Sequence, residues 1–169
     1  MRQWRNRCVS DGYEPGSTFK ILTLAAALDS GAVTTADTFY CGGSEKIEGR
    51  EQILNCWNHA GHGSETTAQA LQKSCNIAFA TSACGRAAAR CMTTAALRLM
   101  EQTGIDLPGE AITLYHSELD LINTPSDLAV ESFGQNSLST PIHMIHRCRC
   151  HCQRREPGHP PCGGPDCGS

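Results

Sequence analysis

One long apolar run stands out near the start of the chain. Residues 21–28 read ILTLAAAL, a turn-forming Glu-Pro-Gly segment at 14–16 precedes them, and Gly31 follows them. Ser17 or Thr18 can cap a helix at this point, and glycine is favoured just beyond a helix end. The pattern predicts a buried helix with a hydroxyl side chain at its N-terminus.

Two further patterns follow this helix. Residues 38–57 contain the short segments TFYC, KIEG and ILNCW, which glycines separate, and this favours strands or a hairpin. Residues 68–80 read AQALQKSCNIAFA, with apolar positions at helical spacing. They predict one continuous second helix, capped by Ser64 or Thr66.

The later part of the chain has weaker patterns. Residues 126–130 predict a short helix, and Pro141 stands where proline favours the first position of another. After Ile145 the apolar pattern stops. From local patterns alone the fold is mixed α and β.

Composition excludes some classes of function. The chain has 169 residues, a net charge of -3, 40% hydrophobic and 18% charged residues, which suits one globular domain. Acidic and basic residues are interspersed, so we expect no nucleic-acid partner. No apolar run reaches the roughly 18 residues of a spanning helix, and residues 1–7 lead into no signal-peptide core.

Two segments differ abruptly from their surroundings. Residues 81–99 are rich in alanine and arginine, and the text from His146 onward is rich in cysteine, histidine and proline. Five of the 11 cysteines fall in this last segment, at positions 148, 150, 152, 162 and 167.

The candidate chemistry begins at the predicted helix start. Ser17 and Lys20 form an S-x-x-K tetrad, which places a hydroxyl and an amine one helical turn apart on one face. A lysine can take the proton of a serine nucleophile when burial lowers its pKa. The tetrad is common by chance, so alone it indicates no more than a capping serine and a solvated lysine.

A second motif changes this interpretation. Ser74-Cys75-Asn76 offers a hydroxyl that can relay a proton and an amide that can orient a substrate carbonyl. S-x-x-K, S-x-N and K-T-G together mark penicillin-binding proteins and related β-lactamases. The first two motifs occur here in that order.

With these motifs, the chain resembles the transpeptidase domain of class B penicillin-binding proteins, of the division and sporulation type. The resemblance covers four segments, 5–31, 56–80, 103–111 and 132–145. The resemblance implies an α/β fold of the penicillin-binding and β-lactamase type, an antiparallel sheet flanked by helices, here incomplete. It also implies that Phe133-Gly134-Gln135 lies near the floor of the active site, where a glycine turn explains it equally well.

The resemblance implies a peptidoglycan D,D-transpeptidase reaction. Ser17 would be the acylated nucleophile, Lys20 its general base, Ser74 part of the proton relay, and Asn76 the ligand of the acyl-side amide. The implied partners are peptidoglycan stem peptides, β-lactam antibiotics and division or sporulation envelope proteins. The implied location is the extracytoplasmic face of the cell membrane, with the anchor outside this chain, and no cofactor or metal is implied.

The sequence departs from the family in one respect. It contains no Lys-Thr-Gly or Lys-Ser-Gly triad, so we expect an internal, catalytically inactive fragment. We assign residues 1–145 to a partial transpeptidase domain, with 81–99 out of frame, and 146–169 to a frame-shifted tail. The tail from His146 can be encoded by codons that, when translated one base out of frame, give Thr-Ala-Val-Ala-Ala-Ile-Ala-Asn-Gly-Gly-Asn-Leu-Val-Thr-Pro. That shifted sequence would continue the helix and then begin a strand.

The cysteines and histidines leave other possibilities open. The tail cysteines, with His151 and His159, could form a zinc-binding interaction module, although they lack paired C-x2-C knuckles. His59 and His62 could suggest a metal pair, but loop packing is the simpler interpretation. Cys41 and Cys56 bracket the predicted hairpin, and we expect them to form a disulfide if the protein faces an oxidising compartment.

The frame interpretation gives the first testable prediction. DNA sequencing across codons 80–100 and beyond codon 145 should reveal a continuous transpeptidase frame that contains Lys-Thr-Gly or Lys-Ser-Gly downstream. An uninterrupted frame that encodes the tail as written, with no family pattern in the neighbouring frames, would make the tail native.

Overall fold

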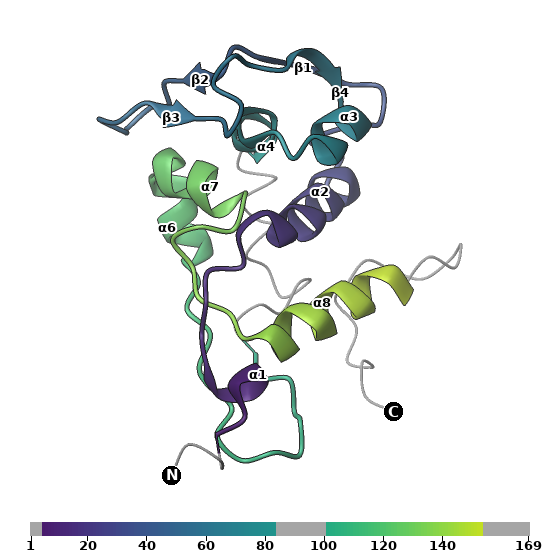
Figure 1. Cartoon of the computed structure of the whole chain (residues 1–169), viewed down its shortest axis with the longest axis vertical. Coiled ribbons are helices and arrows are strands. Elements are labelled where there is room, and N and C mark those ends of the chain that lie inside the picture. Colours follow the sequence, from purple (N-terminus) through teal and green to yellow (C-terminus); the bar gives the residue numbers. More distant parts are fainter. Residues whose placement is uncertain (1–4, 84–100, 154–169) are drawn as a thin grey trace.

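The computed structural model describes residues 5–83 and 101–153, and Figure 1 shows their arrangement. The helical elements are α1 (Arg7–Ser10), the 3-10 helix η2 (Gly16–Phe19), α2 (Lys20–Asp29), α3 (Thr67–Gln72), α4 (Asn76–Ala83), α6 (Glu118–Asn123), α7 (Pro125–Glu131) and α8 (Pro141–Gln153). The strands are β1 (Thr38–Cys41), β2 (Ser44–Glu45), β3 (Leu54–Asn55) and β4 (Gly63–Thr66).

The strands form two small antiparallel ladders at one end of the molecule. β1 pairs with β4, with Cys41 opposite Gly63, and β2 pairs with β3. Below them, α2 packs against η2 and α4 and, on its other side, against α8, while α7 packs on α4 (Figure 1). The described chain is therefore a mixture of helices and antiparallel strands, with α2 in its middle.

The first helix begins later than the sequence predicts. Residues 16–19 form a 3-10 turn, and the α-helix starts at Lys20 without a side-chain cap, so the prediction that Ser17 or Thr18 caps it is wrong. The Thr18 hydroxyl instead donates to the Pro15 carbonyl at 2.7 Å. The predicted C-terminal glycine is confirmed, because Gly31 follows the helix with a φ of 69°.

The second predicted helix is two helices. Thr66 caps α3 through a capping box with Gln69, which confirms one of the two proposed caps. α3 then ends at Gln72, with Lys73 as its C-cap, and α4 starts at Asn76. The interpretation of residues 68–80 as one continuous helix was wrong, since periodicity alone does not reveal this break.

The later helices agree with the sequence at their starts. α7 covers the predicted short helix, and α8 begins at Pro141. α8 runs on to Gln153, so the helix does not end where the apolar pattern stops at Ile145. The frame shifts proposed for 81–99 and 146–169 stay predictions, because residues 84–100 and 154–169 lie outside the described residues.

Two hydrophobic clusters lie on either side of the start of α2. One cluster combines the strand region with α3, α4 and α7: Cys41, Ile47, Leu54, Cys56, Ala70, Cys75, Ile77, Ala78, Ala80, Ala129, Val130 and Phe133. The other joins α2 to α6, α7 and α8: Phe19, Leu22, Ala26, Leu121, Leu128 and Met144. The segment 16–20 is thus held between two packed cores.

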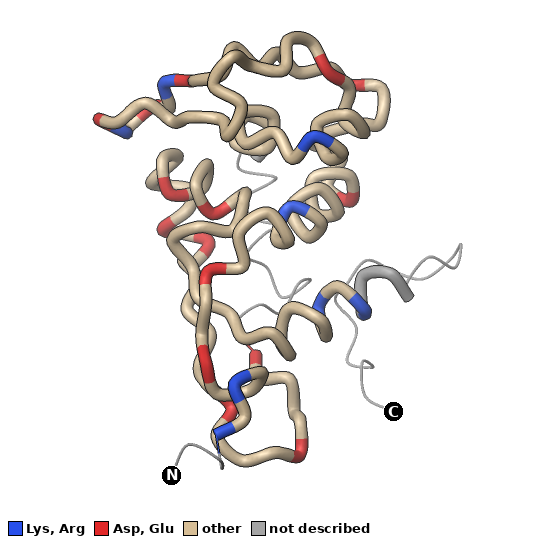
Figure 2. The backbone as a smooth tube through the Cα atoms, viewed as in Figure 1, with Lys and Arg blue, Asp and Glu red and all other residues tan. Residues whose placement is uncertain are grey.

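Acidic and basic residues are interspersed along the described chain rather than gathered in one element (Figure 2). Among the described residues, no helix combines the length and the apolar character needed to cross a bilayer.

The turn before α2 is fixed from below by the segment that follows α7. Gly16 N–H donates to the Gly134 carbonyl at 2.8 Å, and the Thr23 hydroxyl donates to the Ser132 carbonyl at 2.6 Å. Gly134 has a φ of 78°, and a Cβ there would lie 2.2 Å from the Gly16 oxygen and 2.7 Å from Phe19 Cβ. Only glycine fits this contact.

Gly134→Ala should therefore destabilise the fold. Left-handed strain and overpacking together predict a loss of about 2 kcal/mol or more in the free energy of unfolding, measured by urea denaturation. Gly12→Ala is the matched control, because its Cβ would meet Leu138 Cβ at an ordinary 3.7 Å. Equal urea midpoints for the two variants would contradict this account of the turn.

Candidate active site

The centre of the candidate site is the buried ammonium group of Lys20, the first residue of α2. Its side chain is fully buried, and Nζ donates to three oxygens on the turn before α4. These acceptors are the Ser74 carbonyl at 2.8 Å, the Ser74 hydroxyl at 2.9 Å and Asn76 Oδ1 at 2.8 Å. The two sequence motifs, 54 residues apart, thus meet through one nitrogen atom.

Burial also changes the acidity of this lysine. Loss of solvation lowers the pKa of Lys20 from 10.5 to about 8, while electrostatic interactions with the nearby Cys56 and Cys75 side chains oppose the shift. The Phe79 ring lies 5.4 Å from Nζ and adds a cation–π contact. A lysine with this pKa can exist in its neutral, proton-accepting form near physiological pH.

The turn that receives these hydrogen bonds has an unusual backbone. Ser74 has a φ of 53°, in the left-handed region that favours glycine. Its N–H donates to the Leu71 carbonyl, and the Cys75 N–H donates to the Ala70 carbonyl, which together make a Schellman end to α3. A serine in this position costs about 1–2 kcal/mol.

Strained residues of this kind cluster at functional sites. Here the left-handed turn interrupts the helical path between α3 and α4, and it brings both the hydroxyl and the carbonyl of Ser74 within reach of Lys20. The same turn starts α4 at Asn76, so the amide oxygen of that residue meets the same ammonium group.

Ser17 is exposed and lies one turn before Lys20. It lies in the 3-10 turn η2, and its side chain is open to solvent while Lys20 is buried three residues later. Its carbonyl accepts the backbone N–H of Lys20. The structure therefore gathers Lys20, Ser74 and Asn76 in direct contact, with Ser17 beside them at the surface.

The segment around Gly134 has a supporting role. The structure places it beneath Gly16, where its carbonyl accepts the Gly16 N–H. This agrees with the glycine turn, while a place at the floor of the active site stays a prediction. The importance of Ser132 and Thr23, which tie α2 to this segment, had no signal in the sequence.

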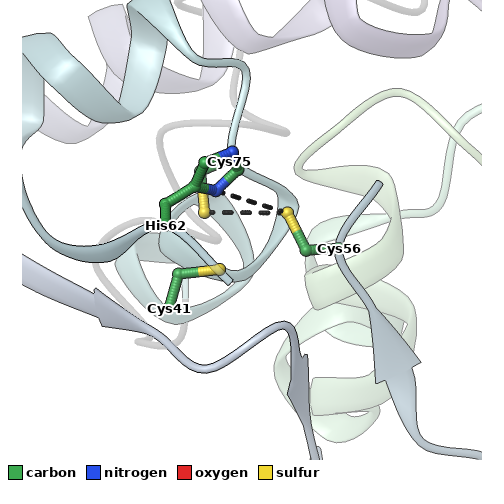
Figure 3. Close-up of side chains that lie close together, drawn as sticks. All are labelled: Cys41, Cys56, His62 and Cys75. Atoms are coloured by element: carbon green, nitrogen blue, oxygen red, sulfur yellow. Dashed lines mark hydrogen bonds between the residues drawn. The ribbon is translucent and has the colours of Figure 1, made fainter. Parts of the chain in front are cut away.

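A second group of side chains lies behind the 74–76 turn. The ligand-type atoms of Cys41, Cys56, His62 and Cys75 all lie within 4.8 Å of one another (Figure 3). Sequence spacing missed this set, because His62 was considered only with its neighbour His59, which is exposed. The three cysteines reach His62 from β1, from the segment after β3 and from the turn before α4.

The predicted disulfide between Cys41 and Cys56 is absent from the structure, in which both thiols are free. Cys56 instead faces His62 Nδ1 at 3.7 Å and Cys75 Sγ at 4.0 Å. Cys41 Sγ and Cys56 Sγ nevertheless lie within 4.8 Å of each other, because both side chains belong to the cluster around His62.

The pKa values of Cys75 and Cys56 are shifted in opposite directions. Burial and the neighbouring Glu65 carboxylate raise the pKa of Cys75. Burial alone would also raise the pKa of Cys56, but the backbone N–H groups of Asn58 and Asn76 and two neighbouring thiols lower it. Of these two thiols, Cys56 is the one that ionises more readily.

The chain matches the family model described as the penicillin binding protein transpeptidase domain over residues 1–149. It is 37% identical over 145 residues to stage V sporulation protein D of Bacillus subtilis, an alignment of 83% of this chain and 22% of that protein. It is 33% identical over 144 residues to the peptidoglycan D,D-transpeptidase PbpA of Mycobacterium tuberculosis, covering 81% of this chain and 28% of that protein.

A solved structure gives the same result for the fold. The imipenem acyl-enzyme complex of penicillin-binding protein A from M. tuberculosis superposes with a TM-score of 0.68 and 27% identity, over 85% of this chain and 33% of that one. The chain spans about a quarter of the length of the relatives it matches. By this match and by the convergence of its two motifs on Lys20, the chain belongs to the penicillin-binding protein transpeptidase domain family.

Proposed function

We propose that this chain carries the nucleophile, general base and proton relay of a serine-type peptidoglycan D,D-transpeptidase. The observation that carries the proposal is the set of three hydrogen bonds from Lys20 Nζ to Ser74 and Asn76. A buried lysine with a lowered pKa, one turn from an exposed serine, is the arrangement that activates a hydroxyl for acyl transfer.

In the proposed reaction, Ser17 Oγ attacks the carbonyl carbon of the penultimate D-Ala of a stem peptide, and its proton passes to neutral Lys20 Nζ. The bond to the terminal D-Ala nitrogen then breaks, and that nitrogen takes a proton through the Ser74 hydroxyl. An amine of a neighbouring stem peptide attacks the acyl ester, forms the cross-link and returns the proton to Ser17. Asn76 holds the acyl-side amide of the donor strand.

The same geometry supports β-lactam binding, since Ser17 Oγ can attack the carbonyl carbon of a β-lactam, open its C–N bond and become acylated. We propose for the intact protein the location and partners that the resemblance implies, the extracytoplasmic face of the cell membrane and division or sporulation envelope proteins. Residues 1–145 are the part of the domain that supplies these groups.

The alternative zinc-binding module in the tail gains no support, because His151 and His159 and most of the cysteines it needs lie beyond the side chains that the structure describes.

The reaction also needs an oxyanion hole and an anchor for the substrate carboxylate. In the family the Lys-Thr-Gly or Lys-Ser-Gly strand supplies one oxyanion donor and the anchor, and no such triad occurs in this sequence. Loss of one oxyanion donor alone costs roughly 100-fold or more in rate. We therefore propose that the chain as written is inactive.

Fluorescent penicillin tests this proposal directly. The chain as written should show no covalent label, and a frame-corrected chain with the third motif should be labelled at Ser17. Ser17→Ala should abolish the label, while Ser44→Ala, at an exposed serine on β2, should leave it unchanged. Stoichiometric labelling of the chain as written would show that the third motif is dispensable.

The acidity of Lys20 is a separate prediction. Carbon-13 NMR of the lysine Cε groups should show one signal that titrates near pH 8, and Lys20→Met should remove it. Because the pKa of the folded state lies below that of the unfolded chain, deprotonation of Lys20 should also increase stability as the pH rises from about 8 to about 10.4. A midpoint above pH 10 for this signal would contradict the proposed role of Lys20 as a base.

A further inference from the structure

We propose that the buried ion pair between His116 and Glu131 positions the turn that carries Ser17 for acyl transfer. Neither residue belongs to the two sequence motifs. The contacts that link the pair to this turn are present in the structure, whereas their effect on acyl transfer rests on the proposed function. His116 and Glu131 are thus positioning residues, which act on Ser17 through the backbone between them.

The pair joins an extended segment to the end of a helix. Glu131 is the last residue of α7, and its side chain is 1% exposed. Its Oε2 atom lies 2.7 Å from Nδ1 of His116, whose side chain is 29% exposed. A carboxylate is unfavourable at this end of a helix, because the free carbonyl groups there carry partial negative charge. Burial removes its water as well, so Glu131 depends on His116 as its partner.

The acidity of Glu131 reflects these opposing effects. Burial raises the pKa of Glu131, the side chain and backbone of His116 lower it, and Asp127, one turn earlier in α7, raises it further. When the carboxylate is ionised, Nδ1 of His116 donates a hydrogen to Oε2, and when it is protonated, Oε2 donates to Nδ1. The pair therefore holds the same two atoms together in either state.

The backbone that follows Glu131 connects this anchor to the Ser17 turn. The Gly134 N–H donates to the Glu131 carbonyl at 2.8 Å, and the Gly134 carbonyl accepts the Gly16 N–H at 2.8 Å. Gly16 directly precedes Ser17 in η2. Two consecutive hydrogen bonds thus lead from the anchored residue to the neighbour of the proposed nucleophile.

A second contact reaches the same turn from the His116 side. The ring of Tyr115 stacks on that of Phe19, the last residue of η2, with 5.9 Å between the ring centroids. Leu114 exchanges backbone hydrogen bonds of 2.9 Å and 2.8 Å with Leu138, which fixes the course of this segment. The segment 114–116 therefore contacts both the η2 turn and the end of α7.

The contact between Gly134 and Gly16 leaves little room for adjustment. A Cβ on Gly134 would lie 2.2 Å from the Gly16 oxygen, so the two backbones already touch. Because packed segments of this kind transmit displacement, a shift of the α7 end moves the Gly16–Phe19 turn as well. A misplacement of about 1 Å can cost about 100-fold in the rate of a positioned reaction. The pair can thus set the rate of acylation without touching the substrate.

Amide hydrogen exchange of the whole chain as written measures this tether directly. The Gly16 and Gly134 N–H groups should both be protected from exchange. His116→Leu removes the hydrogen-bonding nitrogen and leaves the carboxylate without its partner, so both exchange rates should rise roughly tenfold or more. The Cys56 N–H, which is hydrogen-bonded at 2.9 Å in the strand region, is the reference amide and should exchange at an unchanged rate.

Two further variants are the controls. His116→Asn keeps a hydrogen-bond donor at the position of the imidazole Nδ1, so it should preserve the protection of Gly16. His59→Leu makes the same change as His116→Leu at an exposed histidine, and it should leave all three rates unchanged. An unchanged Gly16 rate in His116→Leu would overturn the proposal. An equal rise at Cys56 would overturn it too, because it would indicate a general loss of stability.

Fluorescent penicillin tests the effect on acylation in the frame-corrected chain. His116→Leu should lower the acylation rate constant at saturating penicillin by about tenfold or more. The concentration of penicillin at half-saturation should stay within about twofold, because the pair does not contact the ligand. His116→Asn should restore the rate constant. Weaker binding with an unchanged rate constant would contradict a positioning role.

A double variant separates positioning from the cost of an unpaired charge. His116→Leu combined with Glu131→Met removes both members of the pair, so stability in urea should recover relative to His116→Leu alone. Acylation should remain slow, because the tether is still missing. Recovery of the full acylation rate would overturn the proposal. By contrast, no labelling of the unaltered frame-corrected chain would refute the proposed acyl transfer, and the tether would still be judged by the exchange of Gly16.

Discussion

The buried ammonium group of Lys20, surrounded by oxygen acceptors, is the constraint on which the rest of the described structure depends. Burying a charge is costly unless hydrogen bonds replace the lost water. Here one carbonyl, one hydroxyl and one amide oxygen replace it, and all three come from the 74–76 turn. Each is a charge-assisted hydrogen bond, stronger than its neutral counterpart.

This requirement explains why two separate cores meet at the start of α2. One core holds the strands, α3 and α4 and thereby sets the position of the acceptors. The other holds Phe19 and Leu22 and thereby sets the position of Lys20. The Gly16–Gly134 contact then fixes the turn that carries Ser17 relative to both. A small shift of either core would leave the Lys20 ammonium group without its oxygen acceptors. Close packing of the two cores therefore keeps the hydrogen bonds of this lysine intact.

The parts of the fold that the sequence predicted are those set by local rules. The apolar run of α2, the Gly31 stop, the Thr66 cap and the proline start of α8 depend on neighbouring residues only. The two motifs were found because they occur together and in the order that marks the family. Ser17 was misjudged as a cap, because the 3-10 turn that replaces a cap is imposed by the distant Gly134.

The errors in the candidate site have a common physical origin. The break at Ser74 and the gathering of the cysteines both depend on contacts between segments far apart in the sequence. A Schellman end usually has glycine at its left-handed position, so a serine there gave no warning of a helix end. Similarly, His62 meets its three cysteines only after β1 pairs with β4 and the 56–62 loop folds back on Cys41.

The strained turn and the cysteine cluster can be understood together. Ser74 accepts a left-handed backbone that costs about 1–2 kcal/mol, and something must hold it there. On one side its hydroxyl and carbonyl accept hydrogen bonds from Lys20, and on the other side Cys75 is packed completely among Cys56 and its neighbours. The turn is therefore held from two sides. The Lys20 ammonium group donates hydrogen bonds to its oxygens, and Cys75 is packed in the buried cysteine cluster. A relaxed helical path through residues 73–76 would lose both contacts at once, which is why the strain persists.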